Sequence, residues 1–140
     1  MSSAATLYTP EVLALATSLA AFPLDEALVL RGTARSATCG SSIELGLACS
    51  AAGMIERVGL RTHACAIGQA AAAVFANHAI GRNHAELSQA TTQIEAWLTG
   101  SALPTWPGFT AIAAARDYPA RHGAVLLAWR AALVAIAPPR

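Results

Sequence analysis

The sequence predicts an α+β domain in which four to five helices pack on a three-stranded antiparallel meander. Three short segments with alternating apolar and polar residues follow one another between residues 29 and 60, and this is the period of a half-buried strand. Helical spacing and capping signals lie on both sides of these segments, before residue 23 and after residue 65. At 140 residues, the chain is expected to form one domain, residues 1–140.

The first helix is predicted by its start signals. Thr9 supplies a capping hydroxyl, Pro10 takes the first helical position, and Glu11 places an acid in the first turn. Apolar residues then recur with helical spacing. Because proline interrupts a helix, we expect this one to end before Pro23.

The three strands are predicted by alternation. Between Val29 and Arg35, the polar side chains fall on one face and the small or apolar ones on the other. The second strand is expected from Ile43 to Cys49 and the third from Met54 to Leu60. Their connections are short, as is typical of antiparallel neighbours.

The helices after the sheet are marked by composition and caps. An alanine-rich helix is predicted from Ala66 to Ile80, and Gly81 is a helix stop. Asn83, with Glu86 three residues later, predicts a capping box that opens a helix running to Gly100.

The C-terminal part is predicted as a loop followed by two helical segments. The loop covers residues 101–108, a short helical segment covers 109–116, and a last helix runs from about residue 121 to 137. The three tryptophans are interpreted as core or groove aromatics: Trp97, Trp106 and Trp129.

Composition and charge narrow the function classes. Hydrophobic residues make up 55% of the chain and charged residues 12%, whereas an average soluble domain has about 25% charged residues. This apolar surplus favours a partner surface or a homodimer. The net charge is +1 and the basic residues are spread along the sequence, so no phosphate-binding footprint is visible and nucleic acid is not an expected ligand.

The sequence also predicts a cytoplasmic protein without membrane contact. Met1 to Ala5 carry no basic residue ahead of an apolar stretch, so no secretory signal is expected. The apolar run over 125–137 is interrupted by Arg130 and is shorter than the roughly 20 residues of a membrane-spanning helix. Three cysteines, an odd number, suit reduced thiols better than a disulfide framework.

Two of the cysteines are candidates for chemistry. Cys39 lies beside Gly40 in a loop between two predicted strands, where its thiol would be exposed. Cys65 opens the alanine-rich helix, whose positive end favours the thiolate, the form that binds soft metals and attacks sulfur. The meander would bring both to one end of the sheet. Cys49 is in phase with the apolar residues of its strand and is interpreted as a buried small hydrophobe.

Five short motifs occur in order along the chain: Thr38-Cys39-Gly40, Gly53-Met54-Ile55-Glu56, Ala64-Cys65-Ala66-Ile67, Tyr118-Pro119-Ala120-Arg121 and Leu127-Ala128-Trp129. In these motifs the sequence resembles the NifU/IscU/SufU scaffold family, and its SufU-like branch most closely, from about Leu7 to Ala132. The resemblance implies a SufE/NifU-like fold and a site that holds a [2Fe-2S] cluster or iron through Cys39 and Cys65. It also implies two partners, a cysteine desulfurase and an iron-sulfur acceptor protein.

The chain departs from the family pattern at two ligand positions. The family usually has an aspartate where this chain has Ser41, and a third cysteine where this chain has Ala124. His122 lies two residues before the second of these positions and His63 two residues before Cys65. We therefore consider both imidazoles as replacement metal ligands, because nitrogen and sulfur ligands combine in metal sites.

Three functions remain open on the sequence. The leading hypothesis is a cluster scaffold or carrier, which is not an enzyme. The second is a persulfide shuttle for a cysteine desulfurase, with Cys39 as the sulfur acceptor, or a zinc-binding variant of it. The third is a metal-free interaction module derived from the scaffold fold. Sequence signatures of hydrolases, nucleotide-binding enzymes and zinc proteases are absent.

Overall fold

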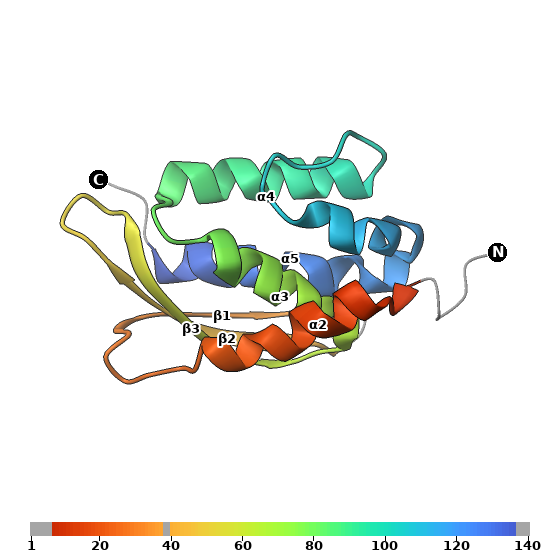
Figure 1. Ribbon diagram of the computed structural model, residues 1–140. Coiled ribbons are helices and arrows are strands. Elements are labelled where there is room, and N and C mark those ends of the chain that lie inside the picture. Colours follow the sequence, from red (N-terminus) through yellow and green to blue (C-terminus); the bar gives the residue numbers. More distant parts are fainter. Residues whose placement is uncertain (1–6, 38–39, 137–140) are drawn as a thin grey trace.

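The computed structural model describes residues 7–37 and 40–136 and confirms the α+β meander (Figure 1). The strands are β1 (Leu30–Arg35), β2 (Ser42–Cys49) and β3 (Ile55–His63). The α-helices are α2 (Pro10–Ser18), α3 (Ala66–His78), α4 (His84–Leu98) and α5 (His122–Ala135), and the short 3-10 helices are η1 (Leu19–Ala21), η2 (Phe109–Asp117) and η3 (Pro119–Arg121).

The sheet has the order β1-β2-β3, and both pairs are antiparallel. Its inner face carries the buried side chains Ile43, Leu45 and Leu47 of β2. Helix α5 packs on this face over β1 and β2. Gly32 in β1 makes the close approach feasible, since a Cβ there would overlap the Ala131 carbonyl and lie 2.9 Å from the Ala135 nitrogen.

Helices α3 and α5 form a middle layer between the sheet and α4, and α2 lies against α3 (Figure 1). Helix α3 is enclosed: a run of small and apolar side chains from Ala70 to Ala76 is buried. Because alanine side chains are small, other elements pack closely against α3 on several sides. Helix α4 begins with the predicted capping box, in which the Glu86 N–H donates to the Asn83 side chain at 2.9 Å and the Asn83 N–H donates to Glu86 at 3.3 Å.

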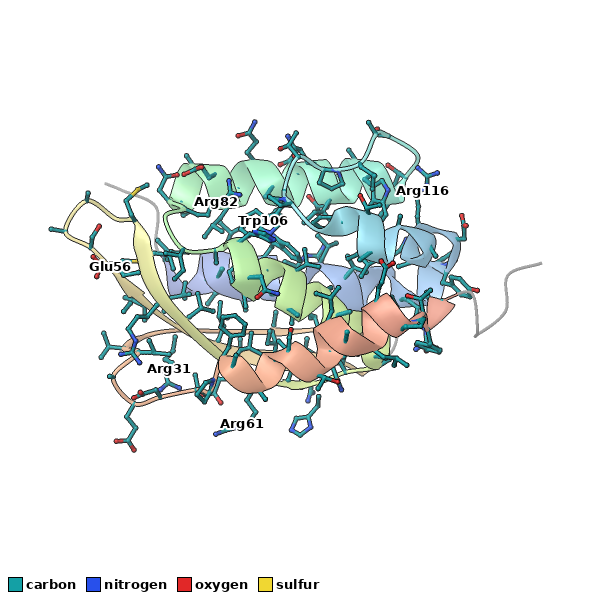
Figure 2. The ribbon with its side chains drawn as sticks, viewed as in Figure 1. Arg31, Glu56, Arg61, Arg82, Trp106 and Arg116 are labelled. Atoms are coloured by element: carbon teal, nitrogen blue, oxygen red, sulfur yellow. The ribbon has the colours of Figure 1, made fainter. Side chains whose placement is uncertain are left out.

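An aromatic cluster fills the space between α3, α4, α5 and the loop before η2. Its members have ring centroids 5.4 to 5.6 Å apart: Phe75, Trp97, Trp106, Phe109 and Trp129. The Trp106 indole N–H donates to the Val74 carbonyl at 3.0 Å, and the Arg82 guanidinium lies 4.5 Å from its ring centroid (Figure 2). The interpretation of the tryptophans as core aromatics is therefore confirmed.

Element boundaries differ from expectation in three places. Helix α3 ends at His78 because the following backbone pairs with β3: the Gly81 N–H donates to Ile55, and the Ile55 N–H donates to Arg82, each at 2.8 Å. Strand β3 extends to His63 because Ser42 pairs with it. The segment after the loop over 101–108 is a 3-10 helix with a kink at Ile112.

The outer face of the sheet is half covered by the segment that joins η1 to β1. Gly46 and Gly59 lie under it, and a Cβ at either position would overlap Leu28. The other half of this face, toward the β1–β2 loop, is open. In the described residues, no helix is long and apolar enough to cross a membrane.

Candidate functional site

The register of the sheet fixes which residues meet at the candidate site. Arg35 pairs with Ser42, and Ser42 pairs with His63. The loop between β1 and β2 and the segment that leads from β3 into α3 therefore leave the same end of the sheet. This loop is closed by backbone hydrogen bonds from the Ser36 N–H to Ser41 at 2.8 Å and from the Gly40 N–H to Ser36 at 3.0 Å.

Cys65 is a half-buried free thiol at this end. It is the N-cap residue of α3, with extended backbone angles, and its carbonyl accepts the Gln69 N–H at 3.0 Å. The Gln69 side chain also donates to the Ala64 carbonyl at 3.0 Å, which fixes the chain just before the cysteine. The thiol is thus held at the N-terminus of a buried helix.

Cys39, the second predicted thiol, lies outside the described residues. Its neighbour Gly40 has a φ of +69°, a left-handed conformation that suits glycine. Ser41 follows, is 3% exposed, and comes directly before the Ser42–His63 pair. The pairing of Cys39 with Cys65 therefore stays a prediction.

Ala124, the second vacant ligand position, lies against the first turn of α3. A Cβ on Gly68 would be 3.2 Å from the Ala124 Cβ and 2.7 Å from the Ala64 Cβ. Ala124 is 1% exposed. The start of α5 is therefore packed against the first turn of α3, the turn that Cys65 caps, so Ser41 and Ala124 lie at the same end of the sheet as this thiol.

The two candidate histidines, His63 and His122, belong to different elements at the end of the sheet where Cys65 lies. His63 is exposed on the outer face of the sheet. His122 is the first residue of α5, and its Nε2 lies 2.7 Å from the Arg116 carbonyl oxygen. Because a carbonyl only accepts, Nε2 carries the hydrogen, and a neutral ring then keeps its lone pair on Nδ1. Helical spacing places His122 about 200° around α5 from Ala124. Metal binding by either histidine stays a prediction.

Within residues 7–37 and 40–136, no three His, Cys, Asp or Glu side chains come together as a metal-binding group. The described part of the chain thus supplies one candidate thiolate and two separate imidazoles.

Cys49 lies at the opposite end of the sheet. The prediction that its side chain is buried is wrong, because the side chain is partly exposed. It is half-buried because the β2–β3 register shifts between Ala48 and Cys49, where Cys49 pairs with Ile55. Burial raises the pKa of the Cys49 thiol above the usual 9.0, and the Glu56 carboxylate raises it further. The thiol therefore stays protonated at neutral pH, in keeping with the absence of a predicted role.

We expect Cys49 to react slowly with iodoacetamide near pH 8, because only the thiolate attacks. The rate should rise about tenfold per pH unit below the pKa. Glu56→Gln should raise the rate at fixed pH, since it removes the repelling carboxylate. Peptide mass spectrometry over a time course measures both effects. A rate that does not change with pH would contradict this account of the thiol.

Solved structures share this fold over most of the chain. A nitrogen-fixing NifU-like protein (N-terminal) from Brucella abortus has a TM-score of 0.79 and 28% identity, covering 90% of this chain and 89% of that one. A SUF-system iron-sulfur cluster assembly scaffold protein from Fervidobacterium islandicum AW-1 has a TM-score of 0.80 and 18% identity, covering 96% and 100%. The chain is thus similar in fold to a NifU-like protein and to a SUF-system scaffold.

A third structure, of a hypothetical protein, matches the chain with a TM-score of 0.69 and 21% identity over 89% of this chain and 96% of the other. No protein-family profile matches the sequence. No curated protein matches it either.

Sequence reasoning missed two features of the structure that bear on the candidate site. One is the contact between Gly68 and Ala124, which no local pattern reveals because it joins two helices. The other is the gathering of arginines on the outer face of the sheet. Alternation already placed Arg31 and Arg35 on one face, and the same alternation in β3 gives Arg57 and Arg61, but the strand register was needed to join them.

Proposed function

We propose that this chain is a scaffold or carrier in iron-sulfur cluster assembly, with Cys65 and Cys39 as thiolate ligands to a nascent [2Fe-2S] cluster or to iron. The observation that carries the proposal is a free, half-buried thiol at the N-terminus of α3, at the end of the sheet from which the loop containing Cys39 leaves. The likeness to a NifU-like protein and to a SUF-system scaffold supports the same role.

The ligand set of this chain favours a weakly held cargo. Iron-sulfur clusters are held by four ligands as a rule, and two family positions carry Ser41 and Ala124 instead. The missing ligands would come from Nδ1 of His122, from His63, from a second copy, or from the protein that donates or accepts the cargo. Incomplete ligation suits transfer, since fewer bonds must break when an acceptor takes over.

Anaerobic reconstitution with ferrous iron and sulfide tests the scaffold role. Wild type is expected to develop sulfur-to-iron charge-transfer absorbance, and Cys65→Ala is expected to lose it. Cys49→Ala is the matched control: it also removes one thiol, but β2 places it seven residues along the strand from the site end, about 23 Å away.

Two results would contradict this proposal. One is wild-type protein that develops no charge-transfer absorbance while its fold, followed by circular dichroism, is intact. The other is a Cys65→Ala variant that holds the same cluster as wild type. Equal losses in Cys65→Ala and Cys49→Ala would also count against a site at the end of the sheet.

A persulfide shuttle is the second candidate, because it needs one accessible thiolate and no ligand set. Here the thiolate of Cys39 or Cys65 attacks the terminal sulfur of a desulfurase persulfide. The S–S bond of the enzyme breaks, its cysteine leaves as thiolate, and the new persulfide forms on this chain, so no external oxidant is needed. Mass spectrometry after incubation with a desulfurase and cysteine would then find one added sulfur and no retained metal.

A further inference from the structure

The open half of the outer sheet face forms a shallow groove of about 750 Å³. Two cross-strand rows build it. Thr33, Glu44 and Arg61 face one another across β1, β2 and β3, and Arg35, Ser42 and His63 form the next row. Because these residues belong to three paired strands, their positions are fixed by the sheet rather than by a loop.

The groove concentrates positive charge. Arg31 and Arg61 both contact the Glu44 carboxylate, each at 3.4 Å, and the Arg61 side chain is 66% exposed. Arg35, also exposed, makes no ion pair with any residue that the structure describes. This face carries four guanidinium groups, of which Arg57 pairs with Asp25; against the carboxylates of Asp25 and Glu44 they leave a charge of +2, whereas the whole chain carries +1. Figure 2 shows Arg31 and Arg61 on the side of the sheet away from α4.

We propose that this face binds an acidic segment of a partner protein. Every basic side chain of the chain other than histidine is arginine, since the sequence has no lysine. The planar guanidinium forms paired hydrogen bonds with a carboxylate, which favours Glu and Asp as its ligands. Arg35 and Arg61 supply the exposed guanidinium groups, and the partner's carboxylates compete with Glu44 for Arg61.

The lining of the groove distinguishes this ligand from two others. The lining contains no Phe, Tyr or Trp, so the large rings on which successive nucleic acid bases stack are absent from it. A small molecule is usually enclosed by its site, whereas this groove lies on an open sheet face. An extended peptide fits both the shape and the charge.

The groove ends beside the candidate thiol site. His63 lines it and lies two residues before Cys65, and Ser42 lines it one residue after the β1–β2 loop. A protein held by its acidic segment would therefore have its remaining surface next to Cys65. A role of this groove in cargo exchange rests on the proposed function. Binding of the acidic segment to the groove does not depend on either thiol.

A binding titration tests the surface directly. The probe is a fluorescein-labelled peptide of alternating glutamate and threonine, and fluorescence anisotropy measures its affinity for the intact chain at low and at physiological salt. We expect saturable binding below about 1 mM that weakens with salt. The double variant Arg35→Gln, Arg61→Gln is expected to bind at least about tenfold more weakly, since it removes two charge-assisted contacts.

The matched control is the double variant Arg116→Gln, Arg130→Gln, which makes the same change in net charge. Arg130 pairs with Glu95 of α4, and Arg116 contacts the Ser101 carbonyl, so both lie away from the groove. This control is expected to bind as wild type does, and circular dichroism checks the fold of each variant.

Several results would overturn the proposed surface. The first is a peptide that shows no saturable binding up to about 1 mM, and the second is a peptide with glutamine in place of glutamate that binds equally well. The third is an equal loss of affinity in both double variants. The fourth is a labelled uridine oligonucleotide that binds more tightly than the acidic peptide. Binding that persists in Cys65→Ala would support a surface independent of the thiol, whatever becomes of the cluster.

Discussion

Gly32→Ala is expected to destabilise the protein by about 3 to 5 kcal/mol, because the added methyl group has no space. Its Cβ would overlap the Ala131 carbonyl of α5 and lie 2.9 Å from the Ala135 nitrogen. These atoms belong to a helix backbone and cannot rotate away, so α5 must move off β1. Chemical denaturation gives the free energy of unfolding, and the midpoint of thermal unfolding should fall by roughly 10 °C or more.

Gly53→Ala is the matched control for this variant. Gly53 has a φ of +83°, and a Cβ there would have no neighbour within 4 Å. Its cost is therefore the left-handed backbone alone, about 1 to 2 kcal/mol. If Gly32→Ala costs no more than Gly53→Ala, the close contact between β1 and α5 is not a determinant of stability.

Ala124→Cys is expected to raise the affinity of the chain for zinc about 100-fold, since a zinc site of four ligands gains roughly 3 kcal/mol from each. Zinc is a suitable probe because it does not change oxidation state. The new sulfur would lie at the start of α5, beside the first turn of α3 that Cys65 caps. Gly68, which has no side chain, borders the space that it enters. Competition with a coloured zinc chelator measures the affinity.

Ala132→Cys separates the metal effect from the effect of packing. Ala132 is also fully buried on α5, but it lies two turns further along the helix, about 12 Å away. Both variants add one buried sulfur atom, but only Ala124→Cys adds it at the end of the sheet where Cys65 lies. Zinc affinity that stays at the wild-type level in Ala124→Cys, with the fold intact, would argue against a shared metal site of Cys65 and position 124.

Local signals were sufficient to predict most of the fold. The Asn83–Glu86 capping box and the alternation in β1 each act within a few residues, so the sequence reveals them directly. The end of α3 was missed because Gly81 and Arg82 pair with Ile55, a residue more than twenty positions earlier. Contacts of that kind depend on tertiary structure and leave no local pattern.

The candidate site was predictable only in part for the same reason. A cysteine before an alanine-rich helix identifies Cys65 from the sequence alone. The position of Ala124 beside the same helix depends on how α5 crosses α3, which periodicity does not determine. Likewise, Arg61 and Arg35 are 26 positions apart in the chain and share a surface only through the register of three strands.

The enclosed position of α3 would constrain how a cargo leaves in the proposed scaffold role. A helix whose alanines contact neighbours on several sides cannot slide or turn without opening the interior of the protein. In the proposed scaffold role, Cys65, the N-cap residue of this helix, would be a stationary anchor. Release of a cargo would then proceed by ligand substitution, with an incoming ligand from the acceptor displacing an outgoing one while Cys65 stays in place.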